Sequence, residues 1–301
     1  MNQFIRTLIF NILYYLGFAH LLFYNNRAKK RIPIILFHRV SPKPSPCWPP
    51  LTPKEFEQTI KLLYKYYTFY SLDDILNPSI KKKRNAACIV FDDGYCDFKE
   101  YAFPVLVKYK TPTTLFIPTH NIDKQEPLWT SIIDDILTHA EQTYHKTDFK
   151  IFNQTVTLLL SSNKELFTTA NAVKNILYEY SYVERDFVIE RLKNQLNLRN
   201  QIPHEPMLSW EEIAEMKKKY PELLNIQSHT HTHPYLPSLN EIEIENELLK
   251  SYKILSEQKF NSTDKIAYPM GGFSKLVLEK TAQHYKFGFA VKNQHYSQKK
   301  L

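Results

Sequence analysis

The sequence has few cysteines and no repeated segment. Only Cys47, Cys88 and Cys96 occur among its 301 residues, and no two of them form a Cys-X-X-Cys pair. An odd and widely spaced set of cysteines argues against a disulfide framework and against a zinc site built from thiolates. Because no internal repeat or low-complexity linker is present either, the simplest organisation is a single domain with an insertion.

Positive charge is in excess but is not concentrated in one place. The net charge is +8, which would suit a nucleic acid, a membrane surface or an acidic polymer as partner. The basic runs at residues 27–31 and 81–84 are short and typical of solvated loops, and no nucleic-acid-binding motif occurs, so we expect no nucleic acid partner. With 43% hydrophobic and 14% aromatic residues, the chain can bury a core, and intrinsic disorder is excluded.

The N-terminal segment is apolar without being a clear membrane span. Residues 4–24 are mostly apolar, but Arg6, Asn11 and His20 interrupt them, and a spanning helix needs about 20 apolar residues. A signal peptide would need a small-residue cleavage site, which is poorly matched here. We predict that residues 1–31 form an apolar or amphipathic helix that either associates with a membrane or packs on the domain. The expected localisation is membrane-associated, on the cytoplasmic face or in the cell envelope.

From residue 32 onwards, predicted strands and helices alternate. Signals for capping boxes at Thr52, Ser209 and Asn240 predict helix starts, and the alternation predicts a parallel sheet covered by helices, with a (β/α) barrel as its natural closed form. The stretch of about 120–206 shows no obvious strand and has a largely helical pattern, so we expect a helical insertion at the rim of the barrel. Short apolar runs predict strands at Pro33–Phe37, Ala87–Phe91, Thr113–Pro118, Leu224–Gln227, Lys265–Tyr268 and Phe287–Val291.

Two adjacent aspartates follow the second of these strands, where barrel proteins place their functional residues. Asp92 and Asp93 precede Gly94, and two neighbouring carboxylates are costly unless a positive group or a cation neutralises them. Successive residues leave a strand in opposite directions, so one carboxylate can bind a metal while the other acts as a base. The alternative interpretation is an Asp-Gly turn that merely ends the strand.

Two further polar motifs follow later strands. Residues 228–234 contain three histidines within five positions. His229 and His233 would share a face on a helical turn and could bind one ion, although a pairing of His229 with His231 in an extended chain is also open. Two imidazoles and one carboxylate leave coordination positions for water and substrate, which is typical of catalytic sites. The turn around Met270 is either an ordinary tight turn or a place where a backbone N–H faces an oxyanion.

The motifs FDDG, SHTHTHP and AYPMGG, in this order and each after a strand, resemble those of the polysaccharide deacetylase family. This is the NodB-homology group, also called carbohydrate esterase family 4. The end of the first strand, Phe37-His38-Arg39-Val40, is similar to the family's first strand, and the resemblance covers roughly residues 32–291. It implies an α/β fold over residues 32–301, namely a distorted (β/α) barrel of the NodB-homology type with a helical insertion.

The resemblance also implies roles for individual residues. Asp93, His229 and His233 would hold a divalent metal ion, usually zinc in such enzymes. Asp92 would be the base that activates the metal-bound water, and the backbone N–H of Met270 could support the oxyanion. The implied enzyme is a metal-dependent hydrolase that removes N-acetyl groups from a cell-surface or envelope polysaccharide or its precursor. Its expected partners are an N-acetylated polysaccharide or lipid-linked glycan and a membrane surface.

Two departures from the family pattern leave alternatives open. Ala267 stands where many members carry an arginine that orients the base. The family's late Leu-X-His segment, which supplies the general acid, is not found, since His295 lacks its context; His38 is the candidate replacement. The alternatives are therefore a catalytically impaired carbohydrate-binding barrel or an amidase that acts on a small molecule. Trp129 and Trp210 either pack in the protein or stack on sugar rings at the rim.

Overall fold

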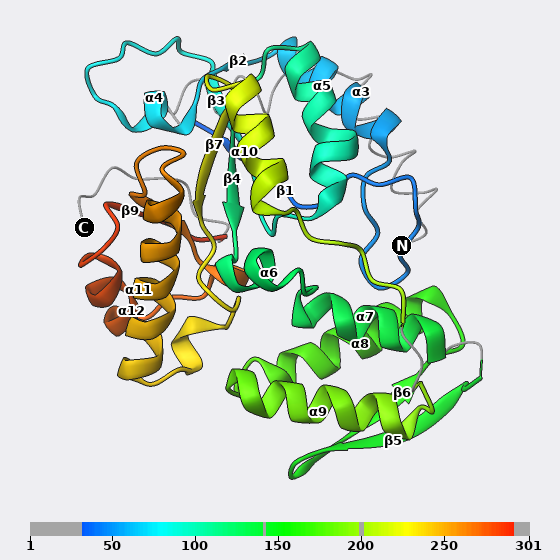
Figure 1. The fold of residues 1–301 in the computed structure, drawn as a ribbon. Helices are drawn as coiled ribbons and strands as arrows, with labels where there is room; N and C mark the ends of the chain where they lie inside the picture. Colours follow the sequence, from blue (N-terminus) through cyan, green and yellow to red (C-terminus); the bar gives the residue numbers. More distant parts are fainter. Residues whose placement is uncertain (1–31, 141–142, 199–201, 292–301) are drawn as a thin grey trace.

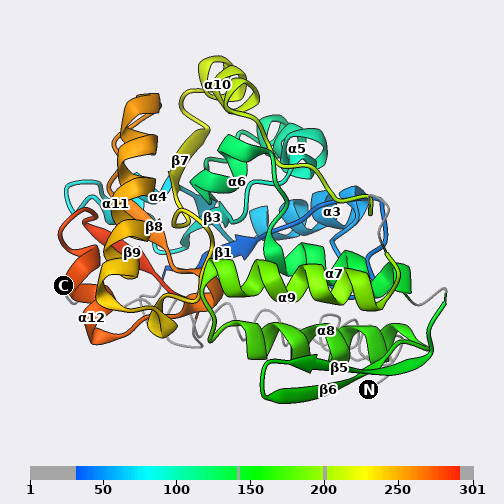
Figure 2. The same ribbon diagram turned by 60° about the horizontal axis from the view of Figure 1, so that its bottom comes forward.

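The computed structural model describes residues 32–140, 143–198 and 202–291. The predicted helix at residues 1–31 and the candidate acid His295 lie outside these ranges, so both remain predictions. Within the described ranges, no helix is long and apolar enough to cross a membrane. A central sheet is flanked by helices, and a second group of elements gathers beyond one end of its strands (Figures 1 and 2).

The central sheet is parallel and curled. All six predicted strands are confirmed, with small differences at their ends. The short strand β2 (Thr68–Phe69) was not predicted, because a strand of two residues shows no recognisable hydrophobic pattern. The two edge strands, β1 (Ile34–Phe37) and β9 (Phe287–Phe289), do not pair with each other in the described part of the chain. The sheet is therefore a half-barrel rather than a closed barrel. In spatial order the strands are β1 (Ile34–Phe37), β3 (Ala86–Phe91), β4 (Thr113–Ile117), β7 (Leu224–Ser228), β8 (Lys265–Ala267) and β9 (Phe287–Phe289), with β2 (Thr68–Phe69) paired to β3.

Three of the covering helices begin where the capping boxes predict. Thr52, Ser209 and Asn240 each accept a hydrogen bond from the backbone three residues later, and the glutamate at that position bonds back. These helices are α3 (Pro53–Tyr64), α10 (Trp210–Lys219) and α11 (Glu241–Gln258). The remaining helices around the sheet are α4 (Leu72–Leu76), α5 (Phe103–Lys108), which continues a π-helical turn at Phe98–Ala102, α6 (Thr119–Lys124) and α12 (Lys275–Thr281).

The inserted region has its own core and is not purely helical. It comprises α7 (Trp129–Ala140), α8 (Asn163–Leu177), α9 (Tyr182–Gln195) and an antiparallel hairpin of β5 (Lys146–Ile151) and β6 (Gln154–Leu159). The expectation of no strand between about 120 and 206 is therefore wrong. Phe149, Ile151 and Leu158 are buried and alternate with exposed, mostly polar residues, a period-2 pattern that also marks half-buried strands.

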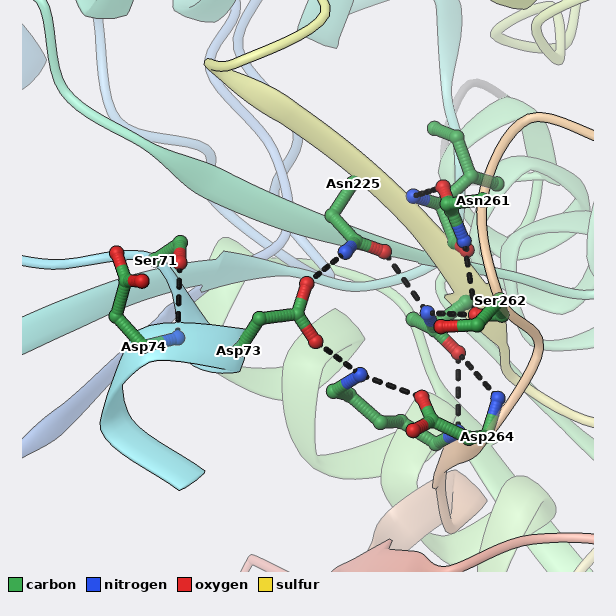
Figure 3. A network of polar contacts seen from close by, with 10 residues as sticks. Ser71, Asp73, Asp74, Asn225, Asn261, Ser262 and Asp264 are labelled. Atoms are coloured by element: carbon green, nitrogen blue, oxygen red, sulfur yellow. Dashed lines mark hydrogen bonds and ion pairs between the residues drawn. The ribbon is translucent and has the colours of Figure 1, made fainter. Parts of the chain in front are cut away.

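A polar network joins α4 to the amino ends of β7 and β8 (Figure 3). The ammonium group of Lys265, which is 1% exposed, forms ion pairs with Asp73 and Asp264. The side-chain amide of Asn225 donates to the same Asp73, and the Gln227 side-chain oxygen accepts from the backbone N–H of Lys265 at 3.0 Å. Because each strand begins here, the network holds the sheet at the end opposite its functional motifs.

Candidate metal centre and active site

The carboxyl end of β3 presents Asp92 and Asp93, which are 5% and 2% exposed. The backbone N–H of Asp92 donates to Phe37 at 3.1 Å, so β1 aligns the residue after Phe37 with Asp92. The chain then turns through left-handed conformations at Asp93 (φ 80°) and Gly94 (φ 79°). A Cβ atom on Gly94 would lie 2.9 Å from the Ile117 side chain, so the close approach to β4 requires glycine here.

The histidine motif follows β7 as a loop and not as the helical turn that the four-residue spacing suggested. The backbone N–H of His229 still donates to Ile117 at 2.9 Å, and the chain then turns at Thr230 (φ 69°) and His233 (φ 56°). These turns bring the rings of His229 and His233 to a centroid separation of 4.9 Å. The ring of His231 instead pairs with the Thr119 hydroxyl at 2.8 Å, so the structure does not place it with His229.

Asp93, His229 and His233 converge on one point, with one ligand atom of each within 4.8 Å of the others. The Asp93 Oδ1 atom lies 3.4 Å from His233 Nε2 and 3.6 Å from His229 Nε2. Two ligand atoms that are each bound at about 2.1 Å to a tetrahedral zinc ion lie about 3.4 Å apart. The donor set of two imidazoles and one carboxylate therefore fits a divalent cation.

The surroundings of His229 prepare it as a ligand. Its Nδ1 atom pairs with the carbonyl oxygen of Ala267 at 2.8 Å; because a carbonyl only accepts, the proton is on Nδ1 and the Nε2 lone pair faces Asp93. Burial first, and the charge of His233 second, lower the pKa of His229 to about 3. The ring is thus neutral at ordinary pH, as a metal ligand must be. Ala267 thus contributes to the site through its backbone carbonyl.

Asp92 lies beside the three converging groups. Its Oδ2 atom is 3.9 Å from His229 Nε2 and 4.0 Å from His38 Nε2, and its buried Oδ1 atom has no hydrogen-bond partner within the described residues. Burial, followed by the charge of Asp93, raises the pKa of Asp92 well above its usual value. Burial would also raise the pKa of Asp93, but the hydrogen bond from His233 and the nearby imidazoles lower it to about 2. The two carboxyl groups are thereby suited to different roles.

The other two predicted site residues, His38 and Met270, are not part of the converging group. His38 follows β1, contacts the Trp48 ring at a centroid distance of 5.1 Å, and has a pKa lowered mainly by burial. Met270 has a left-handed backbone (φ 52°) in the turn after β8, and its side chain packs against the core of the insertion. No contact links Met270 to the aspartates in the described part of the chain, so its oxyanion role remains a prediction.

Two residues that sequence reasoning did not connect with the histidine loop support it. Glu247 of α11 accepts hydrogen bonds from the backbone N–H groups of His231 and Thr232. Trp129 is 5% exposed, and its indole N–H donates to the His233 carbonyl at 3.0 Å. Trp129 is therefore a packing residue and not a rim platform for sugars. Nothing in the local sequence around Glu247 distinguishes it from the other glutamates of that helix.

A curled parallel half-barrel with two aspartates and three histidines at the carboxyl ends of its strands defines a protein of the (β/α)-barrel class. The family model for polysaccharide deacetylase matches residues 79–201 and 168–286. The chain therefore belongs to the polysaccharide deacetylase family, which is a family of hydrolases.

Individual relatives agree with this assignment. YxkH of Bacillus subtilis strain 168, whose name assigns it to the polysaccharide deacetylases, is 31% identical over 114 residues, which cover 36% of this chain and 40% of YxkH. The matched region thus spans less than half the length of that relative. Among solved structures, the deacetylase PplD of Streptococcus pyogenes, in complex with acetate, has a TM-score of 0.55 at 18% identity, with 89% of this chain and 86% of PplD covered. The polysaccharide deacetylase BC0361 of Bacillus cereus gives a TM-score of 0.54 at 19% identity over 88% of this chain and 59% of its own. These two similarities show the fold.

Proposed function

We propose that this protein is a metal-dependent deacetylase that hydrolyses N-acetyl groups on a cell-surface or envelope polysaccharide or its precursor. One observation carries the proposal: the buried group of Asp93, His229 and His233 has the ligand-atom separations of a divalent metal site. Asp92 and His38 lie at its edge, in a chain that belongs to the polysaccharide deacetylase family.

Asp93, His229 and His233 would hold the ion, and zinc is the ion that we expect with two imidazoles and one carboxylate. When bound, such an ion polarises the acetamide carbonyl and lowers the pKa of an attacking water molecule. Because Asp93 is held ionised and His229 neutral, the ligands would keep one net negative charge against the divalent cation.

The remaining side chains move protons. Asp92 accepts the proton of the attacking water, since its carboxyl group borders the ligands without forming part of the converging set. The carbon–nitrogen bond then breaks, acetate leaves, and the departing amine takes a proton from His38. The 4.0 Å gap between Asp92 and His38 is wide enough for the proton to pass through a bridging water. A neutral His38, as its lowered pKa predicts, can accept that proton first and then donate it.

The proposed class of substrate, a polysaccharide, is inferred from the family and not from any contact in the structure. The acetate complex of PplD is consistent with acetyl release, and we extend it to this chain only as part of the proposal. The candidate substrates are N-acetylated polysaccharides or lipid-linked glycans, processed by a membrane-associated protein at the cytoplasmic face or in the cell envelope.

The test combines metal content with acetate release from chitin-type oligomers, measured on the full chain with and without a chelator. We expect about one ion per chain and chelator-sensitive acetate release from the wild type. Asp92→Asn should keep the ion and lose turnover by at least about a hundredfold. Asp148→Asn, in the hairpin of the insertion, is the matched control and should behave like the wild type.

Three results would argue against this function. A wild-type protein that binds no divalent ion contradicts the metal site itself. A wild type that binds the ion and the oligomer but releases no acetate corresponds to the impaired carbohydrate-binding barrel. Acetate release from small amides only, with no action on oligomers, would identify the protein as a small-molecule amidase.

A further inference from the structure

The loop that carries both histidine ligands has an unfavourable backbone. Thr230 has φ 69° and His233 has φ 56°, and a β-branched residue such as threonine rarely adopts a left-handed conformation. Residues in such conformations persist only where their surroundings hold them in place. The convergence of His229 and His233 depends on these turns, so whatever holds the loop also sets the separation of the two imidazoles.

Several backbone groups of the loop are paired with neighbouring elements. The N–H of His229 donates to Ile117, and the carbonyls of Thr230 and His231 accept from the N–H groups of Thr119 and His120 at 3.2 and 2.9 Å. The N–H of Thr230 donates to the hydroxyl oxygen of Ser228 at 3.1 Å. The N–H groups of residues 231 and 232, in the middle of the loop, are bound neither by strand β4 nor by helix α6.

Glu247 on α11 binds both of these groups. Its Oε2 atom accepts from the N–H of His231 at 2.9 Å and from the N–H of Thr232 at 2.8 Å. Its Oε1 atom accepts from the Thr232 hydroxyl at 2.6 Å. One carboxylate therefore forms three hydrogen bonds with two consecutive residues in the middle of the loop, and hydrogen bonds to an ionised acceptor are the stronger kind.

Trp129 of the insertion binds the far end of the same loop. Its indole N–H donates to the carbonyl of His233 at 3.0 Å, and the residue is 5% exposed. The guanidinium of Arg185, on α9, lies 4.8 Å from the centre of the indole ring. The guanidinium of Arg185 thus covers the face of the indole ring, and the carbonyl of His233 holds the indole nitrogen.

We propose that Glu247 and Trp129 are positioning residues that hold His229 and His233 at the separation that binds the metal ion. Neither touches the ligand nitrogens; Glu247 fixes the middle of the loop, and Trp129 fixes its end. This inference rests on the proposed function, since it assumes that the two histidines bind an ion. It also assigns the insertion a role in the site, because Trp129 and Arg185 both come from it.

The test measures binding of zinc alone to the metal-free full chain by competition with a chromophoric chelator. Glu247→Gln and Trp129→Phe should each bind zinc about 10- to 100-fold more weakly, the range seen when residues that orient metal ligands are removed. The visible spectrum of the cobalt-substituted variants should differ from that of the wild type, because it reports ligand geometry. Glu257→Gln, exposed on the same helix, and Trp210→Phe are the matched controls and should leave both readouts unchanged.

The melting temperature of each metal-free variant separates positioning from a merely structural role. If the variants bind zinc as tightly as the wild type and give the same cobalt spectrum, the inference is overturned while the proposed function stands. If the wild type binds neither ion, the proposed function fails and the inference fails with it. Should Glu247→Gln not fold, Trp129→Phe decides the matter, since it retains a buried aromatic ring and removes only the indole N–H.

Discussion

Two aspartates that are adjacent in the sequence have opposite pKa shifts in this protein. Burial and the charge of Asp93 raise the pKa of Asp92 well above its usual value. The pKa of Asp93 is lowered to about 2, because the hydrogen bond from His233 and the neighbouring imidazoles outweigh its burial. The difference arises because Asp93 faces both loop histidines at 3.4 and 3.6 Å, while the nearest imidazole nitrogen to Asp92 is 3.9 Å away. The opposite shifts thus follow from the neighbours of the two carboxyl groups and not from the residue type.

His38 offers the sharpest test at the residue scale. We expect His38→Gln to lower kcat for acetate release by about a hundredfold, because general acid–base groups typically contribute factors of this order. KM and the zinc dissociation constant should stay within about twofold, since His38 is not among the three converging ligand groups and removal of an interaction made only in the transition state lowers kcat alone. Steady-state kinetics and the chelator competition measure the two quantities.

The control for this substitution is His145→Gln, which alters an exposed histidine beside the hairpin of the insertion. It should leave kcat unchanged. If His38→Gln turns over as fast as the wild type, the proton for the leaving amine comes from another group. If His38→Gln loses the ion instead, His38 supports the metal site and is not the acid.

Helix starts could be predicted at the scale of single elements, and the histidine loop could not. A capping box is a local signal, because the side chain and the backbone that it bonds are three residues apart. The loop depends on Glu247, fifteen or more residues along the chain, and on Trp129, about a hundred residues away. The four-residue spacing of the histidines thus pointed to the two rings that converge, although the loop is not the helical turn that the spacing suggested.

The cap of α11 provides a prediction at this scale. Asn240 accepts from the N–H of Glu243 at 3.0 Å, and the Glu243 side chain accepts from the N–H of Asn240 at 2.9 Å. Asn240→Ala should lower the free energy of unfolding by about 1 kcal/mol, because it leaves a helix N–H without its side-chain acceptor. Urea denaturation followed by circular dichroism would measure the change.

Asn246→Ala, the same substitution at an exposed position of α11, is the control. It should be neutral or slightly stabilising, since alanine has the higher helix propensity. Equal losses at the two positions would show that the cap contributes nothing beyond an ordinary asparagine. Because α11 also carries Glu247, a frayed helix start should not weaken zinc binding unless fraying extends beyond the first two turns.

At the scale of the whole molecule, the described residues form four hydrophobic clusters, and the two largest belong to different parts of the fold. One forms within and beneath the sheet, with Phe91 and Ile226 among its members, and the other lies inside the insertion, with Ile133 and Val188. Strand runs and the order of the three motifs were sufficient to predict the first core and its fold. The hairpin and the buried charges of the second core could not be predicted in the same way, since they depend on partners that the sequence does not place side by side.

Two buried carboxyl groups, one in the insertion and one beside the sheet, make the stability of the protein depend on pH. Burial, opposed by Lys174, raises the pKa of Asp134 to about 6, and burial, opposed by Arg39, raises that of Asp97 to about 6. Between about pH 4 and pH 6 the folded state therefore keeps protons that the unfolded state, with carboxyl pKa values near 4, has lost. A state that binds more protons is favoured at low pH, so stability from these two groups falls as pH rises through this window and is constant above it.

Asp134→Asn isolates one of the two contributions. The amide cannot ionise, so the melting temperature of the wild type relative to Asp134→Asn should fall by roughly 4 °C between pH 4.5 and pH 6.5, as expected for a change of about 2 kcal/mol. Above pH 7 the difference should be flat, which provides an internal control. Scanning calorimetry in the presence of a chelator keeps metal binding out of the comparison. A difference that is constant across the whole range, or that grows with pH, would mean that Asp134 is ionised throughout and that its ion pair with Lys174, at 2.5 Å, outweighs the cost of burying it.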